Sequence, residues 1–266
     1  MASLAPILYS YKRCPYAIRA RICLALGGVP VQLREVNLKG KPAHLLQVSP
    51  KGTVPVLYLG YLGECKADDD NGGGAAVTVI EESREIMEWA LRRRDPLQLL
   101  RADGVDVATL DRFDSDFKFH LDRYKYAYRF QKKKEEEKQK EKEKVAEGEV
   151  SAAKEEEVEE AAEVDHREEC MLLLSELEAK LAHGQGWLGG AGPGFTDVAL
   201  LPFVRQFRIA DEKFFNTELQ QRLPCVYDWL VHFLTWDPFL KVMVKFVPWN
   251  PDDDVVLFNP SVEDQL

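Results

Sequence analysis

The sequence predicts an α/β domain followed by an all-helical domain, and two observations support this prediction. Between residues 6 and 94, short apolar runs alternate with segments whose apolar residues recur at helical spacing. After DPLQLL, residues 95–100, only the helical spacing remains. A chain of 266 residues is long enough for two domains of ordinary size. We therefore assign residues 1–97 to the first domain and residues 98–266 to the second.

The first domain has the predicted order β-α-β-α-β-β-α. Its strands are short apolar or alternating runs at residues 6–11, 32–36, 54–60 and 76–80. Its helices are the segments at residues 17–28, 41–49 and 82–94. Between the third and fourth strands, the acidic and glycine-rich ECKADDDNGGG predicts an extended, solvated hairpin loop.

The second domain is predicted to contain helices at residues 107–130, 167–184, 196–210 and 217–236, each with apolar residues on one side. A segment at about 131–164 has almost no large apolar residue and many charges of both signs. Such a segment cannot bury a core, so we expect an insertion that projects from the helical domain, either as a charged helix or as a disordered spacer. A docking arm for a protein partner is the alternative.

Composition limits the classes of partner. The net charge of -10 argues against wrapping nucleic acid, which requires many cations on one face. No apolar run reaches the roughly 18 residues of a membrane span, and the start MASLAPILYSYKR resembles neither a signal nor a transit peptide, so we expect a cytoplasmic protein. The five cysteines form no CxxC pair and no metal-type spacing, which favours reduced thiols and no metal.

Cys14 is the candidate catalytic residue. It directly precedes Pro15, and proline is favoured at the first position of a helix, so Cys14 is predicted to be the N-cap. The sulfur would then face free amides and the positive end of the helix dipole. In such settings a cysteine pKa near 8.5 can fall to about 3.5–7.5, which predicts a thiolate. An incidental exposed cysteine is the alternative.

Two further segments predict a binding site beside this thiol. In KGTVPVL, Pro55 stands at the entrance of a strand, and a cis Val54–Pro55 bond would expose the Val54 backbone to a peptide-like ligand. In IEESREIMEW, Glu82 and Ser83 mark a helix start, where amides and a hydroxyl can bind a carboxylate while the acid holds an ammonium. Together they predict a site for an extended ligand with an amino-acid head group.

Three segments, RCPYAIRARICLAL, SPKGTVPVL and EESREIMEWAL, resemble the active-site helix, the cis-proline segment and the glutamate–serine pair of glutathione transferases. Downstream, LPFVRQF and F-x-x-VM-x-K resemble the helical domain of a bacterial branch of that superfamily. The resemblance covers nearly all of the chain except residues 60–75 and the charged insertion. It implies a thioredoxin-like domain that binds glutathione and a helical domain that lines the pocket of a second substrate.

The CPYA sequence is similar to the cysteine-bearing members of the family, the omega, lambda and dehydroascorbate reductase types, which form a mixed disulfide with glutathione. The resemblance therefore implies a thiol transferase with glutaredoxin-like or dehydroascorbate reductase-like activity and with Cys14 as nucleophile. Val54 and Pro55 would bind the cysteinyl backbone of glutathione, and Glu82 and Ser83 its γ-glutamyl head. Lys51 is a candidate for the glycyl carboxylate.

Other functions stay open at this stage. The second substrate would be a small hydrophobic or disulfide-bearing molecule, and homodimers are common in the family. Conjugation or isomerisation that uses glutathione without covalent cysteine catalysis is one alternative, and a non-catalytic binding module that uses the charged insertion is another. The chain also departs from the family pattern at Gly194, because many members carry Ser or Thr three residues before Asp197, where it completes a capping box.

Overall fold

The structure, a computed structural model, describes residues 5–61, 77–130 and 164–259. Its first part has the predicted order of elements. The strands are β1 (Ile7–Ser10), β2 (Val31–Glu35), β3 (Val56–Tyr61) and β4 (Val77–Ile80), and the helices are α1 (Pro15–Leu26), α2 (Ala43–Val48) and α3 (Ser83–Leu91). The predicted loop at residues 64–74 and residues 131–163 of the charged insertion lie outside the described residues.

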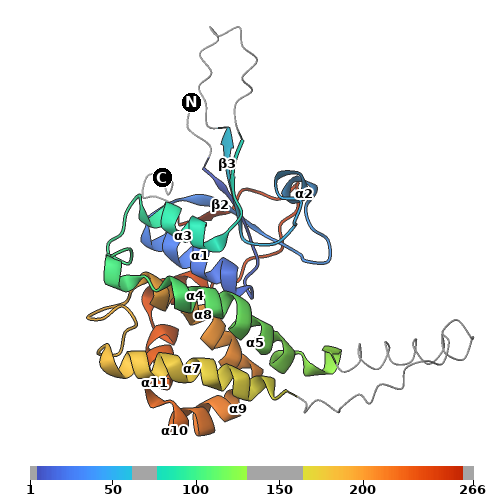
Figure 1. The fold of residues 1–266 in the computed structure, drawn as a ribbon. Helices are drawn as coiled ribbons and strands as arrows, with labels where there is room; N and C mark the ends of the chain where they lie inside the picture. The colour runs from blue at the N-terminus through green and yellow to red at the C-terminus, as the bar shows by residue number, and fades with distance from the viewer. Residues whose placement is uncertain (1–4, 62–76, 131–163, 260–266) are drawn as a thin grey trace, which may run out of the picture.

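The strands form one mixed sheet in the order β4-β3-β1-β2-β5. β1 and β2 run parallel, whereas β3 pairs antiparallel with both β1 and β4. A parallel pair cannot be joined by a tight turn, and α1 supplies the necessary crossover between β1 and β2. In Figure 1, α1 and α3 lie between the sheet and the helical part, while α2 covers the other side of the sheet.

The second part is helical over most of its described length. Its helices are α4 (Val107–Arg112), α5 (Lys118–Lys125), α7 (His166–His183), α8 (Phe195–Ala210), α9 (Glu212–Phe214), α10 (Gln220–Arg222), α11 (Pro224–Leu234) and α12 (Asp237–Val242). A π-helical turn at Phe113–Phe117 divides the predicted helix at 107–130. The predicted helix at 217–236 breaks at Leu223, because Pro224 disfavours helical backbone in the residue before it. No described helix is long and apolar enough to cross a membrane.

One strand lies in the segment that the sequence predicts to be helical throughout. β5 (Leu257–Phe258) pairs antiparallel with β2, so residues 98–266 do not form an exclusively helical domain. The outer edge of β2 carries backbone groups that need partners. The returning chain supplies them; for example, the Leu33 N–H donates to the Val256 carbonyl over 2.8 Å. The local sequence around Leu257 shows only a short apolar run. Whether this run pairs as a strand depends on where the chain returns to the sheet.

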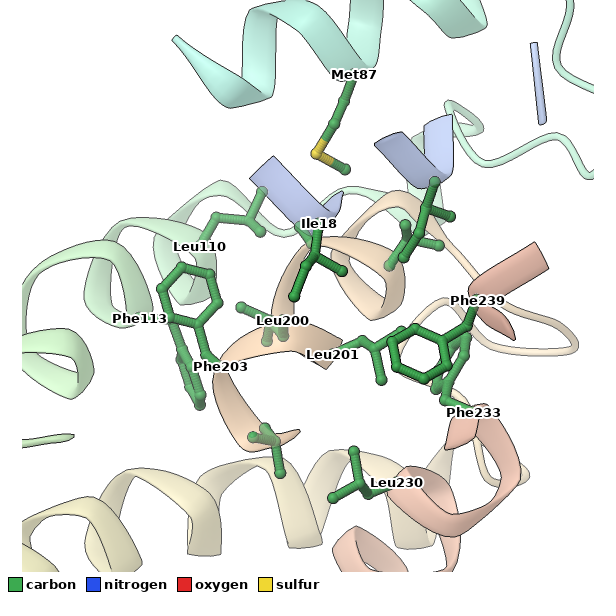
Figure 2. Packing of buried hydrophobic residues seen from close by; sticks show 14 of the residues in the cluster. Ile18, Met87, Leu110, Phe113, Leu200, Leu201, Phe203, Leu230, Phe233 and Phe239 are labelled. Atoms are coloured by element: carbon green, nitrogen blue, oxygen red, sulfur yellow. The ribbon is translucent and has the colours of Figure 1, made fainter. Parts of the chain in front are cut away.

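An apolar core connects the sheet with the helical part. α1 packs against α3 and also against α8. Figure 2 shows Ile18 of α1 between Met87 of α3 and Leu200 of α8, and all three side chains are fully buried. Burial of a large apolar side chain stabilises the fold by about 1.5–3 kcal/mol. The packing therefore fixes α1, and with it the thiol at its N-terminal end, against the helical part.

The start of α8 explains the glycine that departs from the family pattern. Asp197 accepts hydrogen bonds from the Gly194 N–H over 2.8 Å and from Trp229 Nε1 over 2.8 Å. A Cβ atom on Gly194 would lie 2.7 Å from both the Cα and the carbonyl oxygen of Gly104. A serine or threonine would not fit without a shift of one backbone segment. The close approach of two chain segments therefore requires glycine here, and Asp197 anchors the helix start instead.

Candidate active site

Cys14 lies at the N-terminal end of α1. Its backbone is extended, with φ at -77° and ψ at 123°, and Pro15 is the first helical residue. The thiol is free and donates a hydrogen bond to the Val54 carbonyl oxygen, which lies 3.3 Å from Sγ. Cys14 is half-buried and lines a cavity of about 1020 Å³. The structure therefore brings a thiol at a helix start into an open cavity.

Burial raises the pKa of the Cys14 thiol above its ordinary value. The backbone amides of Ala17 and Tyr16 lower the pKa, as do the charges of Lys118 and Arg19, but together they do not outweigh the loss of water around the sulfur. The direction predicted from the helix dipole is therefore wrong. That prediction considered only the local helix, whereas segments distant in the sequence cover the sulfur.

The Val54–Pro55 peptide bond is cis, as expected of a segment whose Val54 backbone is to be exposed to a peptide-like ligand. Val54 and Pro55 both line the cavity. β3 begins at the next residue and pairs with β1, the strand that leads to Cys14. The sheet therefore holds the cis-proline segment beside the thiol.

Glu82 and Ser83 stand at the start of α3, as predicted. Glu82 is the N-cap residue, Ser83 is the first helical residue, and both line the cavity. Lys51 is not part of the cavity lining. Its Nζ lies 2.9 Å from Glu82 Oε1 and 3.9 Å from Glu81 Oε2. Its charge is thus already partly compensated by two acids.

Lys41 is a cavity residue that the sequence does not distinguish from its neighbours. It is exposed and lines the cavity, and its Nζ lies 3.2 Å from where a Cβ on Gly52 would stand. In the part of the chain that the structure describes, Lys41 forms no ion pair. Several lysines surround the α2 segment in the sequence, and only the fold shows which of them faces the cavity.

A buried arginine is a further residue that the sequence does not reveal. Arg19 is 2 % exposed, and its Nη1 lies 2.9 Å from Asp114 Oδ1. Arg19 also donates to Ser83 Oγ from Nε over 3.0 Å and from Nη2 over 2.8 Å. All three residues line the cavity. Because the Ser83 oxygen accepts these bonds, its own hydroxyl hydrogen remains available to a ligand carboxylate.

The rest of the cavity combines apolar and acidic side chains. The apolar side chains from the helical part are Val105, Val107, Leu110 and Phe195. Among residues 5–61, 77–130 and 164–259, no group of three or more His, Cys, Asp or Glu side chains is placed to hold a metal ion. The arrangement thus offers a thiol, a cis-proline segment, a helix start and, in Lys41, a cation without an ion pair among the described residues, around one space with an apolar wall beside them.

Two family models match this chain. The model of the glutathione S-transferase N-terminal domain matches residues 8–98, and the model of the glutathione S-transferase C-terminal domain matches residues 146–232. The chain belongs to the glutathione transferase superfamily. The fold that the resemblance implies, a thioredoxin-like domain followed by a helical domain, is therefore confirmed, apart from the returning strand β5.

Curated members of the glutathione transferase superfamily match over short segments. A probable glutathione transferase of Aplysia californica is 44 % identical over 46 residues, which are 17 % of this chain and 50 % of that protein. Glutathione S-transferase omega-1 of Sus scrofa is 42 % identical over 50 residues, which are 19 % of this chain and 21 % of that protein. The matched segments thus span half or less of these relatives.

Solved structures show the same superfamily fold over almost the whole chain. A glutathione transferase family member from Pseudomonas fluorescens, with two glutathione bound, has a TM-score of 0.60 at 18 % identity, covering 91 % of this chain and 94 % of that one. Glutathione transferase Omega 2C from Trametes versicolor has a TM-score of 0.60 at 19 % identity, covering 90 % of this chain and 93 % of that one. At such identities the likeness establishes the fold alone.

Proposed function

We propose that the chain is a glutathione-dependent thiol transferase in which Cys14 forms a mixed disulfide with glutathione. The observation that carries the proposal is the shared cavity of the Cys14 thiol, the cis Val54–Pro55 segment and the Glu82–Ser83 helix start. The omega-type relatives and the glutathione bound in the Pseudomonas fluorescens structure support the same ligand. The activity would be of the glutaredoxin or dehydroascorbate reductase kind.

Each proposed step exchanges one sulfur–sulfur bond for another. In the first step, Cys14 Sγ attacks the glutathione sulfur of a glutathionylated substrate and forms the Cys14–glutathione disulfide. The substrate disulfide breaks, and the departing substrate thiolate takes up the proton that Cys14 loses. In the second step, the thiolate of a second glutathione attacks the mixed disulfide, oxidised glutathione leaves, and Cys14 recovers a proton. Overall, the substrate thiol is released and one reduced glutathione is consumed, because the glutathionyl group that leaves the substrate ends in oxidised glutathione.

The raised pKa of Cys14 slows this exchange without preventing it. For each unit of increase in pKa, the thiolate fraction at neutral pH falls about tenfold, while the thiolate becomes about threefold more reactive toward disulfides. The net loss is thus about threefold per unit. Cys14 is therefore a less reactive nucleophile than the helix dipole alone would make it, and the loss of rate is smaller than the loss of thiolate.

The ligand would lie along the cavity wall with its parts distributed over distinct residues. The Val54 backbone would pair with the cysteinyl residue of glutathione, and Glu82 and Ser83 would hold its γ-glutamyl ammonium and carboxylate. We assign the glycyl carboxylate to Lys41 rather than Lys51, because Lys51 is already paired with Glu82 whereas Lys41 forms no ion pair among the described residues.

The apolar side chains contributed by the helical part would contact the second substrate. They are Val105, Val107, Leu110 and Phe195, and they line the same cavity as the thiol. Apolar surface of this kind binds ligands by excluding water rather than by charge. A small hydrophobic or disulfide-bearing substrate fits this wall.

The raised pKa also supports a second candidate function, glutathione conjugation or isomerisation. In that chemistry the protonated Cys14 thiol would donate a hydrogen bond to the glutathione sulfur anion, which would itself attack the electrophile. The thiol already donates to the Val54 carbonyl, so it is placed as a donor within the cavity. The two candidates differ in whether a covalent bond forms at Cys14.

Mass spectrometry of the intact protein after incubation with oxidised glutathione tests the proposal. We expect one glutathionyl adduct, which peptide mapping places on Cys14 and which reduced glutathione removes. The Cys14→Ser variant should lose both this adduct and thiol transfer. Adducts on other cysteines alone, or full thiol transfer by the variant, would contradict the mixed disulfide. Conjugation by the native protein without any adduct would support the second candidate.

A further inference from the structure

Arg21 is a fully buried cation that lacks close partners. Its side chain is 0 % exposed, and none of its three guanidinium nitrogens has a hydrogen-bond partner among the described residues. The nearest carboxylate oxygen, Glu35 Oε2, lies 4.0 Å from Nη1 and is itself without a hydrogen bond in the described chain. Buried ions are normally held by tight pairs and several hydrogen bonds. The Arg21 charge is therefore unusually weakly compensated.

Glu35 connects this cation to the turn that presents Cys14. Its other oxygen, Oε1, accepts a hydrogen bond from the Lys12 N–H over 2.7 Å. Within the same turn, the Cys14 N–H donates to the Tyr11 carbonyl over 2.9 Å. Glu35 ends β2, and Arg21 belongs to the helix that begins after Cys14. Glu35 therefore contacts the Cys14 turn through one hydrogen bond from the backbone, and Arg21 lies in the helix that follows this turn.

We propose that Arg21 and Glu35 form a buried charge pair that positions the Cys14 turn and sets the acidity of its sulfur. The ionised Glu35 carboxylate offsets the field of Arg21. Without that carboxylate, the Arg21 field would act on the sulfur uncompensated and favour the thiolate. Both are positioning residues, and the inference rests on the proposed function only in taking Cys14 as the reacting group.

Two cations whose charges lower the pKa of the Cys14 thiol are each paired with an acid. Arg19 and Lys118 lower the pKa of the thiol. Arg19 lies 2.9 Å from Asp114, and Lys118 is bonded to Asp122. Close pairs of this kind cancel most of each other's field at a third group. Arg21 and Glu35, 4.0 Å apart, cancel each other's field less completely.

The titration of the pair is consistent with this role. Burial raises the pKa of Glu35 above its ordinary value, although the Lys12 N–H and the charges of Arg21 and Lys12 oppose the rise. Burial also lowers the pKa of Arg21 to about 10, against the opposing charges of Glu35 and Cys14. Glu35 therefore accepts a proton more readily than an exposed glutamate, and the charge of Cys14 is among those that raise the pKa of Arg21.

The pH dependence of Cys14 alkylation by iodoacetamide tests the inference, with the modified peptide quantified by mass spectrometry. Arg21 lies seven residues beyond Cys14 along the helix, about 10 Å by the helix rise. Two unit charges at about 10 Å and an effective dielectric constant of about 20 shift each other's ionisation by about one pH unit. Arg21→Met should therefore raise the midpoint of the alkylation rate by about one unit. Glu35→Gln should lower it by a similar amount while its amide oxygen still accepts the Lys12 N–H.

The double variant and a surface control separate charge from structure. Arg21→Met with Glu35→Gln should return the midpoint close to the native value, and Arg92→Met should leave it unchanged, because Arg92 is 74 % exposed and paired with Glu88. Shifts of both single variants in the same direction would overturn the inference.

Arg21→Met decides the question alone if Glu35→Gln fails to fold, because the Glu35 carboxylate that it leaves behind keeps the hydrogen bond from the Lys12 N–H. An unchanged midpoint in this variant would likewise overturn the inference. Alkylation requires no glutathione. The midpoints therefore report on the charge pair even if the proposed thiol transfer fails its own test.

Discussion

Replacing Asp114 with asparagine should destabilise the protein more than replacing Arg19 with methionine, although both changes break the same ion pair. Arg19 belongs to α1 and Asp114 to the π-helical turn of the helical part, so the pair joins the two halves of the cavity wall. The two variants differ in what they leave behind. Asp114→Asn leaves a buried cation, whereas Arg19→Met leaves a carboxylate that still has a neighbouring cation.

The magnitudes follow from the burial of each partner. Arg19 is 2 % exposed and Asp114 is 19 % exposed. Removing one partner of a buried pair costs about 3–5 kcal/mol, and the partial exposure of Asp114 places Asp114→Asn near the lower end, at about 3 kcal/mol. After Arg19→Met, Asp114 keeps Arg84 Nε at 3.3 Å, and the variant loses mainly the two bonds to Ser83, which are worth about 1–2 kcal/mol.

Urea unfolding followed by both fluorescence and circular dichroism measures this difference. Coincident transitions by the two probes are needed before a free energy of unfolding is assigned, because the chain has two parts that could separate. We expect Asp114→Asn to lose at least about 1 kcal/mol more than Arg19→Met. An equal or reversed order would refute the reasoning that an uncompensated buried cation dominates the cost.

Three further predictions concern the cavity and the start of α8. Lys41→Met should weaken glutathione binding about tenfold, and Lys51→Met should change it less than about twofold; calorimetry that found the reverse order would return the glycyl carboxylate to Lys51. Because burial raises the pKa of Cys14, the midpoint of its alkylation should lie at a higher pH than that of the same thiol in urea. The protonated thiol should stabilise the folded protein fully at pH values below the pKa of Cys14 in the unfolded chain, and this stabilisation should be lost as pH rises through the pKa in the folded protein. A midpoint below the value in urea would contradict this. Gly194→Ser should lower the free energy of unfolding by about 1–3 kcal/mol, measured by thermal unfolding, because its Cβ would meet the Gly104 backbone at 2.7 Å. This loss is expected even though the serine would complete the capping box. A more stable variant would show that the two segments separate easily.

The sequence alone determined the order of elements in the first part and five of the residues that line the cavity, namely Cys14, Val54, Pro55, Glu82 and Ser83. Apolar spacing of two or about 3.6 residues follows from the geometry of strands and helices, so it is visible in a short window. The Cys14–Pro15 pair gave the start of α1, and the residues before α3 gave its N-cap, because helix starts depend on a few neighbouring residues. The three motifs that resemble the family lie around one cavity in the structure.

Tertiary structure decided the features that depend on distant segments. The chain that returns as β5 pairs with β2, and Gly194 meets Gly104 from another part of the chain. Which lysine faces the cavity depends on how the segment that contains α2 folds back toward the cis-proline segment. None of these contacts leaves a pattern in the local sequence.

The pKa of Cys14 shows the division between sequence and structure most clearly. The helix dipole and neighbouring amides can be inferred from a few adjacent residues, and they do lower the pKa as expected. The larger opposing effect is the loss of water around the sulfur, and its size depends on which distant groups pack over it. The sequence thus determined where the thiol lies, and only the packed structure determined how acidic it is.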